Sequence, residues 1–253
     1  MDFALATGAT SGMGRAIAET LLEDGSFVFL NYAHDTDRAE RLCTELAAHR
    51  GRFEPCRADL STYQGAESLI SEMRERKVQL KYLVLCFGLT DRTHFADITV
   101  EAWERVMRAN VNVPFFLIQG LHTAGILASG ASILCVSSLM ASIPHSTSLS
   151  YGVSKAAVSA LCKNLVKFLA PSDIRINAIE PGFIDTPWQS QKSPEHRRRI
   201  EDKTALGRFG KASEVADMSL AILKNNYLTG SAIQISGGYS CVENVKLSEG
   251  TSQ

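Results

Sequence analysis

The sequence predicts a single α/β domain built on a doubly wound, seven-stranded parallel sheet. Short β-rich runs alternate with amphipathic helical segments along the chain, which is the pattern of βαβ units. A length of 253 residues suits one such sheet with helices on both faces, because parallel strands are joined by right-handed crossovers. No internal repeat, low-complexity tract or Pro/Gly-rich linker divides the chain.

Seven runs are expected to form the strands: residues 3–7, 27–31, 53–57, 82–86, 131–137, 174–179 and 232–235. The polar stretch 189–203 interrupts the alternation, and we expect it to form a helical insertion near the site. The domain is expected to span residues 1–240, followed by a polar C-terminal tail, 241–253.

Composition and charge exclude several classes of function. With 45% hydrophobic residues, 21% charged residues and a net charge of −1, the chain has no electrostatic reason to bind nucleic acid or an anionic membrane. Its apolar runs fall short of the ~20 residues of a transmembrane helix, and the N-terminus lacks a signal-peptide pattern. The six cysteines form no Cys-x-x-Cys pair and no Cys/His cluster, so we expect no metal and a cytoplasmic location.

A glycine-rich turn follows the first strand. Gly8, Gly12 and Gly14 stand between that strand and a helical run that starts at Arg15. Glycines permit close backbone approach, and a helix N-terminus offers free N–H groups and a positive dipole end to a pyrophosphate. In this strand–turn–helix context the turn predicts a dinucleotide-binding site rather than a simple tight turn.

Four polar residues form the second candidate constellation. Tyr151 and Lys155 are four positions apart, so on a helix they share one face. Ser138 follows the fifth strand, and Asn110 falls inside the long helix expected over residues 102–123. Structural explanations exist for each residue, because serines cap loops, Asn satisfies backbone groups and Lys extends into solvent.

Together, the Gly-x-x-x-Gly-x-Gly spacing and these four residues resemble the classical short-chain dehydrogenase/reductase family over nearly the whole chain, and 3-oxoacyl-[acyl-carrier-protein] reductase-like members in particular. The resemblance implies a Rossmann-type fold and hydride transfer between NAD(P)(H) and a ketone or secondary alcohol. It makes Tyr151 the general acid/base, Ser138 the holder of the substrate oxygen, Lys155 a ribose ligand and Asn110 part of a water-linked proton path.

The chemistry accounts for these residue types, because carbonyl reduction needs a proton donor beside the hydride donor. A phenol with a pKa of ~10 is a sluggish acid–base group at neutral pH. We expect the Lys155 ammonium and the positive nicotinamide to lower the pKa of Tyr151 by ~3 units, which is ~4 kcal/mol of electrostatic work.

The resemblance also assigns cofactor positions. Asp59 matches an adenine-contacting acid, Pro181 and Gly182 lie on the nicotinamide side, and Ile184 and Thr186 touch the carboxamide. Asp59 alone is equally well explained as a charge at a helix N-terminus. The expected cofactor-binding set is Gly8, Ser11, Gly12, Met13, Gly14, Tyr32, His34, Asp59, Leu60, Gly88, Tyr151, Lys155, Pro181, Gly182, Ile184 and Thr186.

Cofactor choice depends on the end of the second strand. Tyr32 stands where NAD-preferring members carry an acid, so repulsion of a 2′-phosphate is absent, and His34, Arg15 or Arg38 are candidates to approach it. NADP(H) is therefore favoured over NAD(H), although Ser11 replaces a basic residue found in many NADP-dependent relatives.

The fourth strand departs from the family pattern. It ends Leu85-Cys86-Phe87-Gly88 instead of Asn-Asn-Ala-Gly. We expect Cys86 to be a buried small hydrophobe rather than a nucleophile, and Phe87 to narrow the adenosine side of the cleft.

The substrate is expected to be a small carbonyl or alcohol compound with an apolar body. The residues expected to contact it are Ser138, Met140, His145, Tyr151, Phe183 and Trp188. Two other functions stay open: a 3-oxoacyl-[acyl-carrier-protein] reductase, and a non-catalytic NADP(H)-binding sensor or scaffold. Residues 109–136 contain no Lys or Arg to dock an acidic carrier protein, which favours free substrates. A homo-oligomer, tetramer or dimer, is expected to pair through residues 102–123 and 151–170.

Overall fold

The computed structural model describes residues 1–144 and 148–241, and its centre is a seven-stranded sheet in which all neighbours are parallel. The strand order is β3-β2-β1-β4-β5-β6-β9, and β7 and β8 form a separate two-stranded pair. The strands are β1 (Phe3–Ala6), β2 (Phe27–Tyr32), β3 (Phe53–Arg57), β4 (Leu80–Leu85), β5 (Leu127–Val136), β6 (Arg175–Pro181), β7 (Ile184–Asp185), β8 (Gly210–Lys211) and β9 (Ala232–Ile235). The predicted single doubly wound domain is confirmed.

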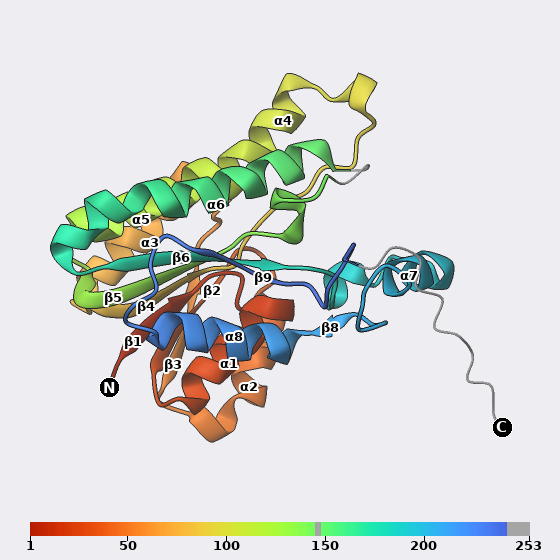
Figure 1. Ribbon diagram of the computed structural model, residues 1–253. Coiled ribbons are helices and arrows are strands. Elements are labelled where there is room, and N and C mark those ends of the chain that lie inside the picture. The colour runs from red at the N-terminus through yellow and green to blue at the C-terminus, as the bar shows by residue number, and fades with distance from the viewer. Residues whose placement is uncertain (145–147, 242–253) are drawn as a thin grey trace.

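The α-helices cover both faces of the sheet, with α3 to α6 on one side and α1, α2 and α8 on the other (Figure 1). They are α1 (Gly12–Glu23), α2 (Thr36–Glu45), α3 (Tyr63–Glu75), α4 (Val100–Met107), α5 (Val113–Thr123), α6 (Leu149–Leu169), α7 (Pro194–Glu201) and α8 (Ala212–Lys224). Within the described residues no helix combines the length and apolar character needed to cross a bilayer.

Alternate residues of each central strand serve two hydrophobic cores, one per face. On β4, Leu83 and Leu85 pack beneath α3, α5 and α6, whereas Tyr82 and Val84 pack over α1 and α8. The period of two along a strand sends neighbouring side chains to opposite faces. Because both faces are covered, these strands are continuously apolar, which is why their positions are readable from the sequence.

The expected helix over residues 102–123 is interrupted. A π-helical turn, Arg108–Asn112, separates α4 from α5. Pro114 lies in the first turn of α5 and has no N–H to donate to the carbonyl of Asn110, four residues earlier. The missing hydrogen bond explains the local change of helix type and places Asn110 at an irregular turn.

The insertion expected over residues 189–203 is only partly helical. A 3₁₀ turn, Pro187–Gln189, comes first, and α7 follows after a short loop. Ile200 of α7 packs with Phe183 and Phe209 in a small cluster beside the main cores. This segment lies past the end of the sheet with β8 (Figure 1).

The direction in which the chain adds strands reverses between β1 and β4. Strands β2 and β3 lie on one side of β1, while β4, β5, β6 and β9 follow on the other. Ligands of doubly wound folds bind at the carboxyl ends of the strands beside this point. The glycine turn after β1 and the residues after β4 and β5 therefore meet at one edge.

Candidate active site

A cavity of about 740 Å³ opens at the carboxyl edge of the sheet. It joins the glycine turn after β1 to the ends of β4, β5 and β6, to α6 and to the segment before α7. Among the residues predicted for the site, it is lined by Gly8, Ser11, Gly12, Met13, Gly14, Gly88, Ser138, Met140, Tyr151, Lys155, Pro181, Gly182, Phe183, Ile184, Thr186 and Trp188. Most of the predicted cofactor and substrate residues therefore line one continuous cavity.

The glycine turn is shaped for close approach to a ligand. Gly8 has a φ of +62°, and a Cβ on Gly14 would overlap the Gly8 carbonyl oxygen. Helix α1 starts at this turn, and Ser11 makes no side-chain cap bond. No acidic residue lies in the first turn of α1 either. These features leave a helix N-terminus with its positive dipole end available to an anionic group, which fits the pyrophosphate of a dinucleotide.

Ser138, Tyr151 and Lys155 lie close together in the lining of the cavity. Ser138 follows β5 in extended conformation, and its hydroxyl accepts a 3.1 Å hydrogen bond from the Met140 amide. The Tyr151 and Ser138 side chains are hydrogen-bonded to each other. The Lys155 ammonium donates to the Val136 carbonyl at 2.7 Å and lies 5.5 Å from the centre of the Tyr151 ring.

The electrostatics of this group differ from the expectation for Tyr151. Burial raises the pKa of Tyr151 to about 12, and the hydrogen bond with Ser138 offsets only part of that effect. Burial also lowers the pKa of Lys155 to about 8. The expected lowering depended on the positive nicotinamide together with Lys155, so it stays a prediction for the cofactor complex, whereas desolvation dominates in the protein without cofactor. The phenol is held protonated, which suits a proton donor.

Asn110 does not line the cavity but lies directly behind it. Its Oδ1 accepts from the Leu89 amide at 2.7 Å, and its Nδ2 donates to the Leu89 carbonyl at 2.8 Å and to Ser154 Oγ at 2.9 Å. Both Asn110 Oδ1 and Lys155 Nζ lie 3.3 Å from where a Cβ on Gly88 would be. The side-chain amide thus clamps the loop after β4 onto α6.

A buried carboxylate beneath the site was missed by the sequence reasoning. Glu180, near the end of β6, accepts from Ser159 at 2.7 Å and from Ser142 at 3.1 Å. The Ser159 hydroxyl also lies 2.9 Å from the Ser137 hydroxyl, which donates to the Lys155 carbonyl at 2.8 Å. The sequence contained a signal for Glu180, because an acidic residue inside a run of otherwise apolar strand residues requires buried hydrogen-bond partners.

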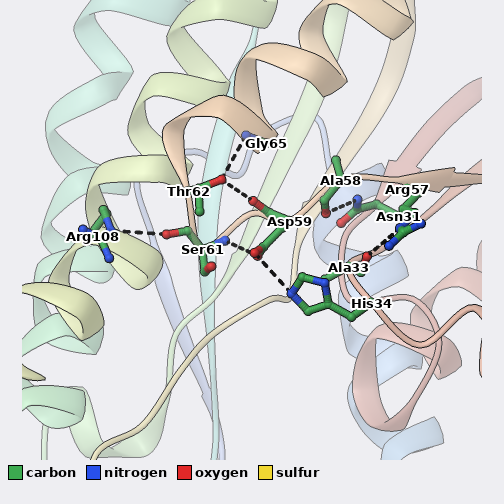
Figure 2. Close-up of polar contacts among 10 residues, drawn as sticks. All are labelled: Asn31, Ala33, His34, Arg57, Ala58, Asp59, Ser61, Thr62, Gly65 and Arg108. Atoms are coloured by element: carbon green, nitrogen blue, oxygen red, sulfur yellow. Dashed lines mark hydrogen bonds and ion pairs between the residues drawn. The ribbon is translucent and has the colours of Figure 1, made fainter.

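The predicted adenosine-side residues lie at or just beyond the ends of β2 and β3, outside the lining of the main cavity. Figure 2 shows two of them, His34 and Asp59, in contact with each other. Asp59 forms an ion pair with His34 at 3.2 Å, and its carboxylate accepts from the Ser61 amide at 2.9 Å. Burial would raise the pKa of Asp59, but the bonds from Ser61 and the contact with His34 outweigh it and lower the pKa. Leu60 is buried in the core under α3, so only its backbone is free to face a ligand.

The arginines expected near a 2′-phosphate, Arg15 and Arg38, are paired with carboxylates. Arg15 is bound to Glu19 at 2.8 Å and Glu45 at 2.6 Å, and Arg38 pairs with Asp35 at 3.2 Å. Arg57, which the sequence reasoning missed, is the register partner of Tyr32 on β3. It is exposed, and its one side-chain hydrogen bond among the described residues is to the Ala33 carbonyl at 3.3 Å, so its guanidinium keeps free donors at this edge.

Thr7 holds the backbone after β4, where the chain departs from the family's Asn-Asn-Ala-Gly pattern. Its hydroxyl accepts from the amides of Cys86 at 2.9 Å and Phe87 at 3.2 Å. Burial raises the pKa of Cys86 to about 11, against the behaviour of a reactive thiolate. Phe87 lines the cavity and also packs against the core under α3, α5 and α6.

The substrate side of the cavity has an apolar floor and a polar rim. Met140, Phe183 and the half-exposed Trp188 form the floor, whereas His145 lies outside the described residues. Arg92, after β4, and Lys192 and His196, around the start of α7, also line the cavity and were not predicted. No group of three or more His, Cys, Asp or Glu among the described residues is placed to hold a metal ion.

Comparisons with known proteins agree with this architecture. A family model described as enoyl-(acyl carrier protein) reductase matches residues 8–240. The chain is 30% identical over 237 residues to the 3-oxoacyl-[acyl-carrier-protein] reductase FabG of Aquifex aeolicus (strain VF5), covering 92% of this chain and 95% of that relative.

Solved structures show the same fold. A short-chain dehydrogenase/reductase from Serratia marcescens superposes with a TM-score of 0.88 at 25% identity, covering 94% of this chain and 98% of that one. The NADP complex of RhlG from Pseudomonas aeruginosa gives 0.87 at 30% identity, covering 94% and 96%. Sequence, fold and relatives agree that this chain is an oxidoreductase that belongs to the short-chain dehydrogenase/reductase family.

Proposed function

We propose that this oxidoreductase transfers a hydride between NADP(H) and a ketone or secondary alcohol, with Tyr151 as the proton-transferring residue. One observation carries the proposal. The protonated phenol of Tyr151, hydrogen-bonded to Ser138, lies in the same cavity as a glycine turn whose helix N-terminus is open to an anion. A proton donor and a dinucleotide site are the two components that carbonyl reduction requires.

A nicotinamide cofactor held by the glycine turn and by Pro181 and Gly182 would supply the hydride for the carbonyl carbon. Ser138 and Tyr151 hold the carbonyl oxygen, and Tyr151 gives its phenolic proton to that oxygen as the alcohol forms. Lys155 lies within 5.5 Å of the Tyr151 ring centre, so its positive charge stabilises the phenolate left behind. Asn110 keeps the wall beside them in place through Leu89 and Ser154.

NADP(H) is the proposed cofactor, in preference to NAD(H). Tyr32 places no carboxylate at the end of β2, and the exposed Arg57 lies at its register partner position on β3. RhlG, a structural relative, is described in complex with NADP, which supports the same choice here. His34 is a second candidate contact, although its pairing with Asp59 competes with it.

Reduction of 3-oxoacyl groups on a carrier protein is the second candidate function. It is favoured by the likeness to FabG over 92% of this chain. The absence of Lys and Arg from residues 109–136 disfavours a docking site for an acidic carrier on that face, so free substrates remain our preferred reading.

The proposal also includes a homo-oligomeric assembly and a cytoplasmic location. Phe116 on α5 and Phe168 on α6 are 46% and 61% exposed, which supports pairing of these helices between copies in a dimer or tetramer. All six cysteines are free thiols, as expected for a protein that works in the reducing cytoplasm.

The proposed function is tested by following nicotinamide absorbance with a panel of ketones, alcohols and acyl thioesters. We expect NADPH-dependent reduction of at least one oxo compound and the reverse oxidation of its alcohol product. Tight NADPH binding without turnover on any member of the panel would instead support a sensor or scaffold.

A further inference from the structure

Three basic side chains form the rim of the cavity on its substrate side. Arg92 lies in the loop after β4, Lys192 in the loop before α7 and His196 on α7, and all three line the cavity. They come from two separate segments of the chain and line the same cavity as the apolar floor of Met140, Phe183 and Trp188.

No acidic side chain balances this rim. Among the described residues that line the cavity there is no Asp or Glu. The acids next to Arg92 and on α7 are engaged elsewhere: Asp91 pairs with Arg105 at 3.5 Å, and Glu195 pairs with Arg199. Arg92 and Lys192 form no ion pair with any described carboxylate, so their charges face the cavity uncompensated.

The cations are close enough to repel one another. Burial first, and then the positive charge of Arg92, lower the pKa of Lys192. Burial, Lys192, Arg199 and Arg92 lower the pKa of His196 in the same way. Lys192 is also held in place, because its ammonium lies 5.8 Å from the centre of the Phe183 ring. Like charges gathered at one position are relieved by an anion.

The rim residues come from other elements than the glycine turn, which suits a pyrophosphate. The glycine turn belongs to β1 and α1, whereas Arg92 lies beyond Thr90, whose hydroxyl is 3.4 Å from Ser148 at the start of α6. Ser148 directly precedes the helix that carries Tyr151. Arg92 therefore lies on a loop that contacts the start of the helix carrying Tyr151, and Arg92, Lys192 and Tyr151 line the same cavity.

We infer that the substrate is an oxo compound with an apolar body and an anionic group, a carboxylate or a phosphate, which Arg92 and Lys192 bind at the rim of the cavity. The inference rests on the proposed reductase function and names its substrate class. The apolar floor takes the body, and the two cations take the anionic end, which fixes the orientation of the carbonyl beside Tyr151.

Matched substrate pairs test this inference. One pair is a medium-chain oxo carboxylic acid and its methyl ester, and the other is a 3-oxoacyl pantetheine thioester with and without its 4′-phosphate. We expect the anionic member of at least one pair to have a kcat/KM about 10- to 100-fold higher, the range of a hydrogen bond to a charged group. The pair that discriminates identifies the source of the anion.

Variants locate the effect. Arg92→Gln and Lys192→Gln should each remove most of the preference, mainly by raising the KM of the anionic member. Arg198→Gln is the matched control, because Arg198 is exposed on the same helix, α7, and does not line the cavity. It removes the same charge and should retain the preference.

Three outcomes decide the matter. The inference is overturned if kcat/KM is equal for the two members of both pairs. It is also overturned if Arg198→Gln loses the preference for the anionic member as Arg92→Gln does. In either case the reductase function stands. A fall in NADPH affinity of Arg92→Gln and Lys192→Gln, with the substrate preference kept, assigns the rim to the cofactor instead. If no member is reduced, the proposed function fails, and calorimetric titration of acid and ester into the NADP⁺-bound protein still tests the anion site by itself.

Discussion

Replacing Asn110 by Ala should destabilise the protein strongly, because its side-chain amide is fully used. The amide makes three hydrogen bonds, two to the backbone of Leu89 and one to Ser154, and it is 2% exposed. At ~1 kcal/mol net for each bond, the variant should lose ~3 kcal/mol of unfolding free energy. For a domain of this size that corresponds to a fall in Tm of ~6–12 °C.

Asn112→Ala is the matched control. Asn112 lies in the same π-helical turn, but it is exposed and makes one 3.3 Å bond to Tyr63. Its loss should cost less than ~0.5 kcal/mol, as for ordinary surface substitutions. Urea unfolding of both variants, at one protein concentration and without cofactor, measures the difference.

The same clamp should matter for catalysis. Asn110 holds the loop that carries Gly88 against Lys155, so the variant should also show a lower kcat at temperatures where it is folded. The reasoning is refuted if the unfolding free energies of Asn110→Ala and Asn112→Ala differ by less than ~0.5 kcal/mol, because the loss of three buried hydrogen bonds should lower the unfolding free energy by more than that.

Three further predictions concern pH, cofactor and substrate. Burial lowers the pKa of Lys155 to about 8, so its positive charge is present below that pH. The kcat/KM for reduction should therefore fall as the pH rises through about 8. A pH profile of kcat/KM that stays flat to pH ~9.5 would contradict this. Calorimetry should show tighter binding of NADPH than of NADH, and Tyr32→Asp should narrow or reverse the difference while Tyr32→Phe keeps it; tighter NADH binding by the wild type would defeat the assignment. Carrier-bound 3-oxoacyl thioesters should have no advantage in kcat/KM over truncated ones at low ionic strength, and a large advantage lost on adding salt would reveal a basic docking site.

The fold was readable from the sequence because the central strands are apolar on both faces. Strands β3 and β9 were predicted to the residue, and the other five strands of the main sheet to within four residues at either end, whereas β7 and β8 were not predicted. The largest error is at β5, which starts at Leu127 rather than 131, because Ser129 and Gly130 look like loop residues. The break between α4 and α5 depends on a missing hydrogen bond from Pro114, which periodicity does not show.

The parts of the candidate site that depend on local sequence spacing were predictable. The parts that depend on contacts between distant segments were less so. The i, i+4 relation of Tyr151 and Lys155 and the glycine spacing are local, so the sequence shows them directly. Arg92 and Lys192 are one hundred positions apart and meet only through packing, and Arg57 becomes a neighbour of Tyr32 only through sheet register. The raised pKa of Tyr151 was missed because desolvation depends on burial that no motif encodes.

The central claim is that Tyr151 transfers the proton, and Tyr151→Phe tests it most directly because it removes one hydroxyl and keeps the ring. With the best substrate of the panel, the variant should bind NADPH with nearly wild-type affinity and lose turnover by about 10²- to 10⁴-fold, the usual contribution of a general acid. Reduction at a near wild-type rate with intact NADPH binding would contradict the assignment.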